Sequence, residues 1–174
     1  MLTSHELLGF MSPTLALEIL TFSYETDKAL YHATLSAVAQ ARKLRPVFLE
    51  RQPRSQRHTM MLATLTRPAL DLVAGNLLRT WLLKKHKQML VDFLDALGVV
   101  HQDGVVEDLP KSMDDAKVHA AVEGLLAKHP PEAVAVYLHA FNDMNEVEWP
   151  NLKAMLDADP RLQLGEATTG PVTK

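Results

Sequence analysis

Residues 69–98, ALDLVAGNLLRTWLLKKHKQMLVDFLDALG, indicate the fold class of the whole chain. The stretch contains no proline, and at ~1.5 Å per residue residues 69–97 would form a helix of roughly 43 Å. Its apolar residues recur at the three- and four-residue steps of a helix, at Leu70, Val73, Leu77 and Trp81 and again at Leu90, Phe93, Leu94 and Leu97. The stripe is interrupted at residues 84–87, KKHK. We therefore expect a long helix with a kink or break there, or else with a middle turn that crosses solvent.

Most of the remaining chain has the same helical periodicity. Ser12 and Asp27 are N-cap signals, and the prolines allow only a short turn after Pro46. Ser112 and Asp115 have the spacing of a capping box. The predicted helices span residues 14–24, 28–44, 56–66, 113–128, 132–144 and 150–158, in addition to 69–97. The sequence thus predicts an all-α, single-domain helical bundle of about six to seven helices over residues 1–164, followed by a disordered tail at 165–174.

Residues 98–110, GVVHQDGVVEDLP, interrupt this helical pattern. Gly98 is suited to end a helix with a positive φ, and Asp103-Gly104 between valine pairs is a hairpin signal. We expect a short turn or hairpin-like connector near residues 99–106, with His101 and Asp103 at its exposed tip. A catalytic or metal-binding loop is the alternative. On the turn interpretation, Gly104→Val should destabilise the fold by roughly 1 kcal/mol or more, and His101→Ala should be nearly silent.

The composition excludes several kinds of chemistry. The 174 residues include no cysteine, which excludes disulfides, thiolate zinc sites, iron–sulfur clusters and a cysteine nucleophile. No apolar run approaches the ~20 residues of a membrane-spanning helix, and the N-terminus lacks the features of a secretory signal. We expect a soluble, unprocessed, cytoplasmic protein that does not bind membranes.

The net charge of −3 conceals a strong segregation of charge along the chain. Residues 42–87 hold eleven basic and two acidic residues, whereas residues 88–174 hold six basic and fifteen acidic ones. The basic segment could pair internally with the acidic half, or it could bind an anionic partner. The candidate anion-binding residues are Arg42, Lys43, Arg45, Arg51, Arg54, Arg57 and Arg67, and the basic run continues to Lys84, Lys85 and Lys87. Nucleic acid stays open as a partner, although the segment has few aromatic residues and no helix-turn-helix signature.

His139 and Asp143 are the best candidates for a metal site. They stand four residues apart on one predicted helix, so both could bind the same ion if other segments supplied further ligands. His119 and His129 are the obvious donors. The common alternative is a solvated contact between neighbouring turns of the helix. No metalloprotease, nucleophile-elbow, phosphate-loop or dinucleotide-binding motif occurs in the chain.

These patterns predict a non-catalytic helical binding or interaction module without a cofactor. Its partner would be another protein or a second copy of the same chain. Two alternatives remain open: binding of nucleic acid or another anionic partner through the basic residues 42–87, and a metal-dependent enzyme that uses His139 and Asp143.

Overall fold

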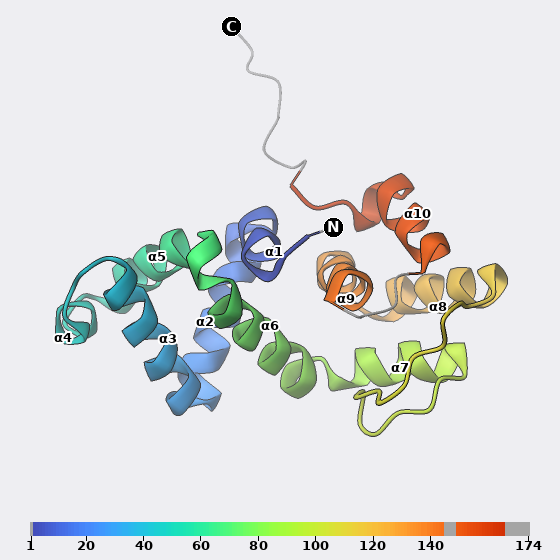
Figure 1. Ribbon diagram of the computed structural model, residues 1–174, viewed down its shortest axis with the longest axis horizontal. Helices are drawn as coiled ribbons and strands as arrows, with labels where there is room; N and C mark the ends of the chain where they lie inside the picture. The colour runs from blue at the N-terminus through green and yellow to red at the C-terminus, as the bar shows by residue number, and fades with distance from the viewer. Residues whose placement is uncertain (1, 145–148, 166–174) are drawn as a thin grey trace, which may run out of the picture. The chain divides into compact units, whose positions relative to one another are not determined.

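The structure is a computed structural model that describes residues 2–144 and 149–165 (Figure 1). These residues form ten α-helices and two short 3-10 helices, and they contain no β-strand beyond one isolated bridge. The predicted all-α class is confirmed. None of the described helices combines the length and apolar composition that a bilayer span needs. The tail predicted to be disordered begins at Gly165, and its remaining residues, 166–174, lie outside the described residues.

The chain divides into two compact units. One comprises Thr3–Trp81, and the other comprises the chain from Leu82 onward together with the first two residues. The boundary falls inside helix α6 (Asp71–Lys85). The single domain predicted over residues 1–164 stays a prediction.

The unit formed by residues 3–81 is built around α3 (Lys28–Ala41). Helix α3 packs against α2 (Pro13–Thr26), α4 (Pro46–Glu50) and α5 (Arg54–Leu65), and α5 also contacts α2 and α1 (Ser4–Phe10) (Figure 1). The 3-10 helix η1 (Pro68–Leu70) leads into α6. Fully buried side chains from these helices form the core, among them Leu7, Ile19, Leu20, Leu35, Leu49, Met61 and Leu65.

The starts of the early helices follow the local signals in the sequence. The side chains of Ser12 and Asp27 accept hydrogen bonds from the backbone N–H groups of Leu15 and Leu30, at 3.2 and 3.1 Å. Helix α1 was not predicted. It begins with a capping box in which the Glu6 carboxylate accepts a 2.8 Å hydrogen bond from the backbone N–H of Thr3.

The second unit contains α7 (Lys87–Leu97), α8 (Asp115–Lys128), α9 (Pro131–Met144), α10 (Pro150–Ala158) and the 3-10 helix η2 (Pro160–Leu162). Helix α7 packs along α8, and α9 contacts α8, α10 and η2 (Figure 1). Edge-to-face rings fill the core, with Phe141 5.3 Å from Phe93 and 5.4 Å from Trp149 between centroids. The Trp149 indole N–H donates to the carbonyl of Pro110 at 2.8 Å, which ties the connector to this core.

The predicted helix count was too low, for three reasons. The long helix breaks at His86 into α6 and α7, within the KKHK interruption where a break was expected. Helix α4 is counted as a helix although it is a single short turn, and α1 was missed. The predicted capping box of Ser112 and Asp115 is also wrong: α8 begins at Asp115, and the side chain of Asp114 accepts from the backbone N–H of Lys117 at 3.2 Å. Adjacent Ser, Asp and Asp residues offer competing caps, which the sequence pattern does not separate.

The hairpin-like connector is confirmed. Gln102 and Val105 exchange two backbone hydrogen bonds of 2.9 and 3.0 Å around Asp103 and Gly104, whose φ angles are 52° and 86°. Two positive φ angles in a two-residue loop are those of a type I′ turn. Gly98 ends α7 with a φ of 70°, as expected.

His101 is not at an exposed tip, contrary to the prediction. Only 11% of its side chain is exposed. Its Nδ1 accepts a 3.1 Å hydrogen bond from the backbone N–H of Gly104, so the ring hydrogen is on Nε2, which lies 2.7 Å from the Asp95 carboxylate. The imidazole therefore connects the turn to the last part of α7.

We accordingly expect His101→Ala to destabilise the protein by about 1–2 kcal/mol, because it leaves the Gly104 N–H and Asp95 without their partner. Urea denaturation followed by circular dichroism measures this change. Gln102→Ala, at an exposed neighbouring position, serves as the control and should change the free energy of unfolding little. An equally small effect of His101→Ala would restore the original expectation.

Candidate anion-binding site

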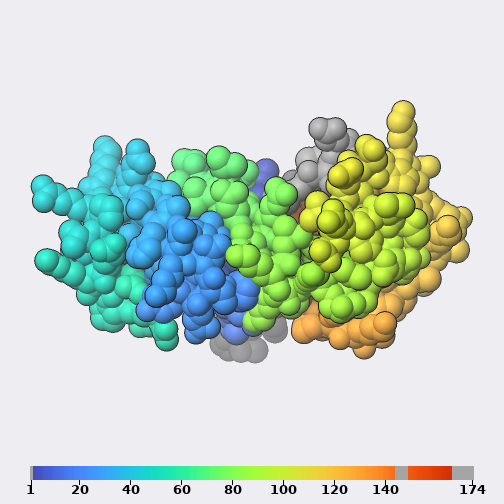
Figure 2. All heavy atoms as spheres, turned by 90° about the horizontal axis from the view of Figure 1, so that it is seen from below, coloured from blue at the N-terminus to red at the C-terminus, as the bar shows by residue number. Residues whose placement is uncertain are grey.

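The seven candidate anion-binding residues all lie between the end of α3 and the start of η1, in the unit formed by residues 3–81. We call residues 42–67 the cationic segment. This segment contains α4 and α5. Side chains of its turquoise part project from the surface in Figure 2. Five of the seven side chains are exposed and two are half-buried. The exposed ones are Lys43, Arg45, Arg51, Arg54 and Arg67, and the half-buried ones are Arg42 and Arg57.

Helix ends position most of these cations. Lys43 has a positive φ of 57° where α3 ends, and the backbone N–H of the following Leu44 folds back to the Ala39 carbonyl at 2.8 Å. Arg45 and Arg51 are the capping residues on either side of α4. Because α4 has five residues and turns toward the core through Leu49, its two ends place both arginines at the surface.

The cations of the segment are not neutralised within their own unit. Across residues 3–81, all of which the structure describes, none of the seven has a carboxylate oxygen within 4 Å. Arg42 instead donates to the Thr64 hydroxyl at 3.1 Å, and Arg57 donates to neutral oxygens. Internal pairing inside this unit therefore does not account for the segregation of charge.

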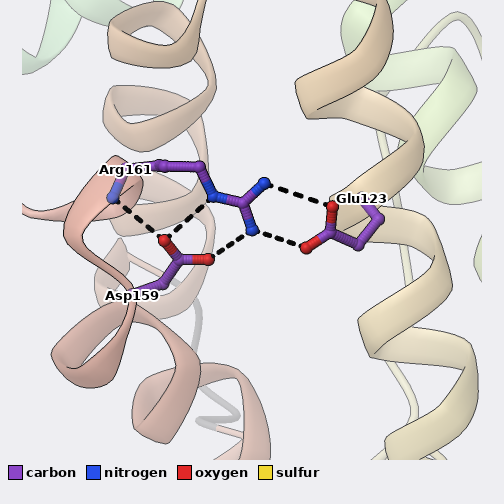
Figure 3. Close-up of polar contacts among 3 residues, drawn as sticks. All are labelled: Glu123, Asp159 and Arg161. Carbon is purple, nitrogen blue, oxygen red and sulfur yellow. Dashed lines mark hydrogen bonds and ion pairs between the residues drawn. The ribbon is translucent and has the colours of Figure 1, made fainter.

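Arg161 in the other unit shows the opposite arrangement (Figure 3). Its guanidinium group donates to the Asp159 carboxylate and to both oxygens of Glu123, joining η2 to α8. Hydrogen bonds from Asp159 and Glu123 raise the pKa of Arg161, and its guanidinium group lowers the pKa of both carboxyls. This arginine is paired with two acids, whereas the cations of the cationic segment have no carboxylate oxygen within 4 Å among residues 3–81.

A chain of hydrogen bonds behind the cationic segment runs from Arg57 through Tyr31 to His58. Arg57 Nε donates to the Tyr31 hydroxyl at 2.8 Å, and Arg57 Nη1 donates to the Glu50 carbonyl at 3.1 Å. The hydroxyl lies 3.0 Å from His58 Nε2. Because arginine can only donate, the hydroxyl accepts from Arg57, and it can give its own hydrogen to His58 when the neutral ring carries its hydrogen on Nδ1.

Aromatic rings and guanidinium groups pack together at the same place. The rings of Tyr24 and Tyr31 meet edge to face at 5.1 Å, and the His58 ring is 5.6 Å from that of Tyr31. The guanidinium carbon of Arg54 lies 5.3 Å from the Tyr24 centroid, and that of Arg57 lies 5.7 Å from both tyrosine centroids. Such contacts hold a cation by the negative face of the ring and leave its formal charge in place.

Burial keeps Tyr31 and His58, the two inner residues of this series of hydrogen bonds, uncharged. His58 is 3% exposed, and its burial, together with the positive charges of Arg57 and Arg54, lowers its pKa to about 4. Burial raises the pKa of Tyr31, against the opposing effect of Arg57. At neutral pH the charge of this cluster therefore resides on the two arginines alone.

Sequence reasoning missed Tyr24, Tyr31 and His58. Tyr31 and His58 are 27 residues apart and on different helices, and the aromatic residues have no motif spacing. The single signal in the sequence was the isolated histidine among arginines, RSQRH, which by itself indicates neither burial nor a partner.

The two candidate metal ligands each have protein partners. His139 Nε2 lies 3.0 Å from the carbonyl of Leu162, and the Asp143 carboxylate accepts hydrogen bonds from the backbone N–H of Leu2 at 2.7 Å and from Asn142 at 2.9 Å. His129, expected as a further ligand, instead lies 3.2 Å from Asp92. Within residues 2–144 and 149–165 no three His, Cys, Asp or Glu side chains are grouped as a metal ion would require. The metal hypothesis stays a prediction without a third ligand on the described part of the chain.

Comparison of the chain with protein-family models, with curated proteins and with solved structures finds no match.

Proposed function

We propose that this protein is a non-catalytic binding module whose cationic segment docks an acidic, partly apolar segment of another protein. The observation that carries the proposal is the absence of any carboxylate partner for the seven cations within residues 3–81. Seven positive charges on residues 42–67 that have no carboxylate partner within residues 3–81 repel one another, which costs folding energy. An acidic partner would relieve that repulsion on binding.

Exposed apolar side chains between the cations favour a protein over a nucleic acid. Val47 and Phe48 on α4 are 44% and 47% exposed, between Arg45 and Arg51. Successive helix residues are about 100° apart, so with Leu49 fully buried these two side chains remain at the surface. Arginine together with an aromatic side chain is typical of the energetically important centre of protein interfaces.

The experiment compares three probes of equal negative charge by calorimetric titration at about 50 mM salt. They are a peptide that alternates glutamate with leucine, the same peptide with serine in place of leucine, and a single-stranded oligothymidylate. We expect the glutamate–leucine peptide to bind most tightly, because it satisfies both the charges and the apolar side chains of α4. Its affinity should fall as the salt concentration rises and the Debye length shortens to ~8 Å at physiological strength.

Charge-reversal variants test whether the peptide binds at the cationic segment. Arg45→Glu combined with Arg51→Glu should weaken binding of the glutamate–leucine peptide by about tenfold or more, because it replaces attraction by repulsion at both ends of α4. Lys117→Glu combined with Lys153→Glu makes the same change in net charge at exposed positions of the other unit, and it should have little effect. Equal weakening by both variants would contradict the assignment to the cationic segment. Tighter binding of the oligothymidylate than of either peptide would make nucleic acid the partner.

A further inference from the structure

A pocket of about 590 Å³ lies in the unit formed by residues 3–81, where helices α2, α3, α4 and α5 meet. Its size is within the ~300–1,000 Å³ typical of small-molecule sites. Tyr31 and Leu35, both buried, form part of its wall, and Tyr24 and the exposed His32 contribute flat rings. The pocket shares Glu50 and Arg57 with the cationic segment, but it does not include the two arginines and two apolar side chains proposed above as the docking surface of α4, which are Arg45, Arg51, Val47 and Phe48.

Four charged side chains line this pocket without pairing with one another. They are the carboxylates of Glu25 and Glu50 and the cations of Lys28 and Arg57. Within residues 3–81 no oxygen of either acid lies within 4 Å of either cation, although Glu25 and Lys28 are only three residues apart. The pocket is therefore neutral overall and presents separated charges of both signs.

Arg57 is held in place by neutral groups. Two of its five N–H groups are used, one on the Tyr31 hydroxyl and one on the Glu50 carbonyl oxygen, and both acceptors are uncharged. The Tyr31 hydroxyl is itself committed to Arg57 and His58, so it is not a free donor for a ligand. The guanidinium group is thus oriented in advance while its positive charge remains available to an anion.

We propose that this pocket binds a zwitterion with an aromatic ring, either an aromatic amino acid or a short peptide that ends in one. Its carboxylate would pair with Arg57 and Lys28, its ammonium group with Glu25 and Glu50, and its ring would lie against Tyr24 and His32. A simple anion satisfies only the two cations and is repelled by the two carboxylates. A ligand with both charges satisfies all four side chains at once.

Calorimetric titration of the full chain tests the charge requirement. The probes are the dipeptide alanyl-phenylalanine, its N-acetyl form, its C-terminal amide, free phenylalanine and inorganic phosphate. We expect the dipeptide to bind with a Kd below about 1 mM and each blocked form to bind about tenfold more weakly, because each loses one charge-assisted contact. The ratio of dipeptide to phenylalanine affinity distinguishes a peptide from an amino acid as the natural ligand.

Two conservative variants test which side chains of the pocket bind the amine and which bind the carboxylate of the ligand. Glu25→Gln should reduce the preference for the free amine over the N-acetyl form, with Glu50 left as its partner, and Lys28→Gln should reduce the preference for the free carboxylate over the amide, with Arg57 left as its partner. Both side chains are exposed, and within residues 3–81 neither has a hydrogen bond or ion pair through its charged group, so both variants should fold. Lys153→Gln, an exposed residue in the other unit, should leave all five affinities unchanged.

The inference fails if no peptide or amino acid binds at 10 mM, or if phosphate binds as tightly as the dipeptide. It also fails if the blocked forms bind as well as the free dipeptide. Arg45→Glu with Arg51→Glu should not change dipeptide binding, since neither residue lines the pocket. Loss of macromolecular binding with retained dipeptide binding, or the reverse, therefore separates this site from the surface of α4.

Discussion

Gly104→Val is expected to destabilise the unit from Leu82 onward by roughly 3 kcal/mol, since backbone strain and overpacking add. Gly104 has a φ of 86°, a conformation that β-branched residues resist. A Cβ at this position would also lie 2.9 Å from the Cβ of Leu90, a 4% exposed residue of α7. That atom is fixed to the helix backbone, so the hairpin would have to move away from α7. Urea denaturation monitored by circular dichroism measures the loss.

Two alanine variants separate the contributions to this effect. Gly98 also has a positive φ, 70°, but a Cβ there would meet nothing within 4 Å, so Gly98→Ala should show the backbone strain alone, about 1 kcal/mol. Gly104→Ala should cost about 1–3 kcal/mol more, because it adds the close approach to Leu90. If the two alanine variants proved equally stable, the hairpin would not pack against α7 as described.

Acidification is expected to destabilise the unit formed by residues 3–81 by roughly 3 kcal/mol through His58, because burial and the charges of Arg57 and Arg54 lower its pKa from 6.5 to about 4 on folding. In the unfolded chain His58 binds a proton near pH 6.5, whereas the folded protein excludes that proton until about pH 4. The unfolded state therefore holds more protons between these values. Stability is fully present above pH 6.5 and is lost as the pH falls toward 4.

His58→Gln tests this prediction by removing the titrating group while keeping a side chain that can accept from the Tyr31 hydroxyl. The free energy of unfolding of the variant, measured by urea denaturation at intervals from pH 7.5 to 4, should depend less on pH than that of the wild type. His32→Gln removes a nearby exposed histidine and should retain the pH dependence of the wild type. Parallel curves for the wild type and His58→Gln would mean that the buried imidazole does not control acid stability.

Much of the fold could be predicted because it depends on neighbouring residues. Ser12 and Asp27 cap helices through residues three positions away, and Gly98 and Gly104 adopt positive φ wherever such turns are built. The break at His86 follows from a local loss of the apolar stripe. The errors were also local: Asp114 instead of Ser112 caps α8, and α1 is shorter than the windows in which periodicity can be detected.

For the candidate site, the sequence predicts which residue types are present and how they are spaced, but not which of them meet. The excess of arginine and lysine in residues 42–67 is a property of the sequence, and so is the presence of His139 and Asp143 four residues apart. Whether a cation meets a carboxylate depends on where distant segments pack. Arg161 pairs with two carboxylates, whereas Arg51 has none within 4 Å among residues 3–81, and the sequence around each arginine does not distinguish them.

By itself, then, the sequence determined the all-α class, most helix boundaries and the hairpin turn at Asp103-Gly104, because hydrogen bonding and backbone sterics between near neighbours fix each of them. The segregation of charge is a property of the sequence itself. Only the tertiary structure decided that His58 is buried beside Tyr31, that Arg57 is held by neutral oxygens, and that four unpaired charges line one pocket. These features join residues as far as 32 positions apart on four helices. The packing between these helices sets their burial and charge state, and a pattern of neighbouring residues does not predict that packing.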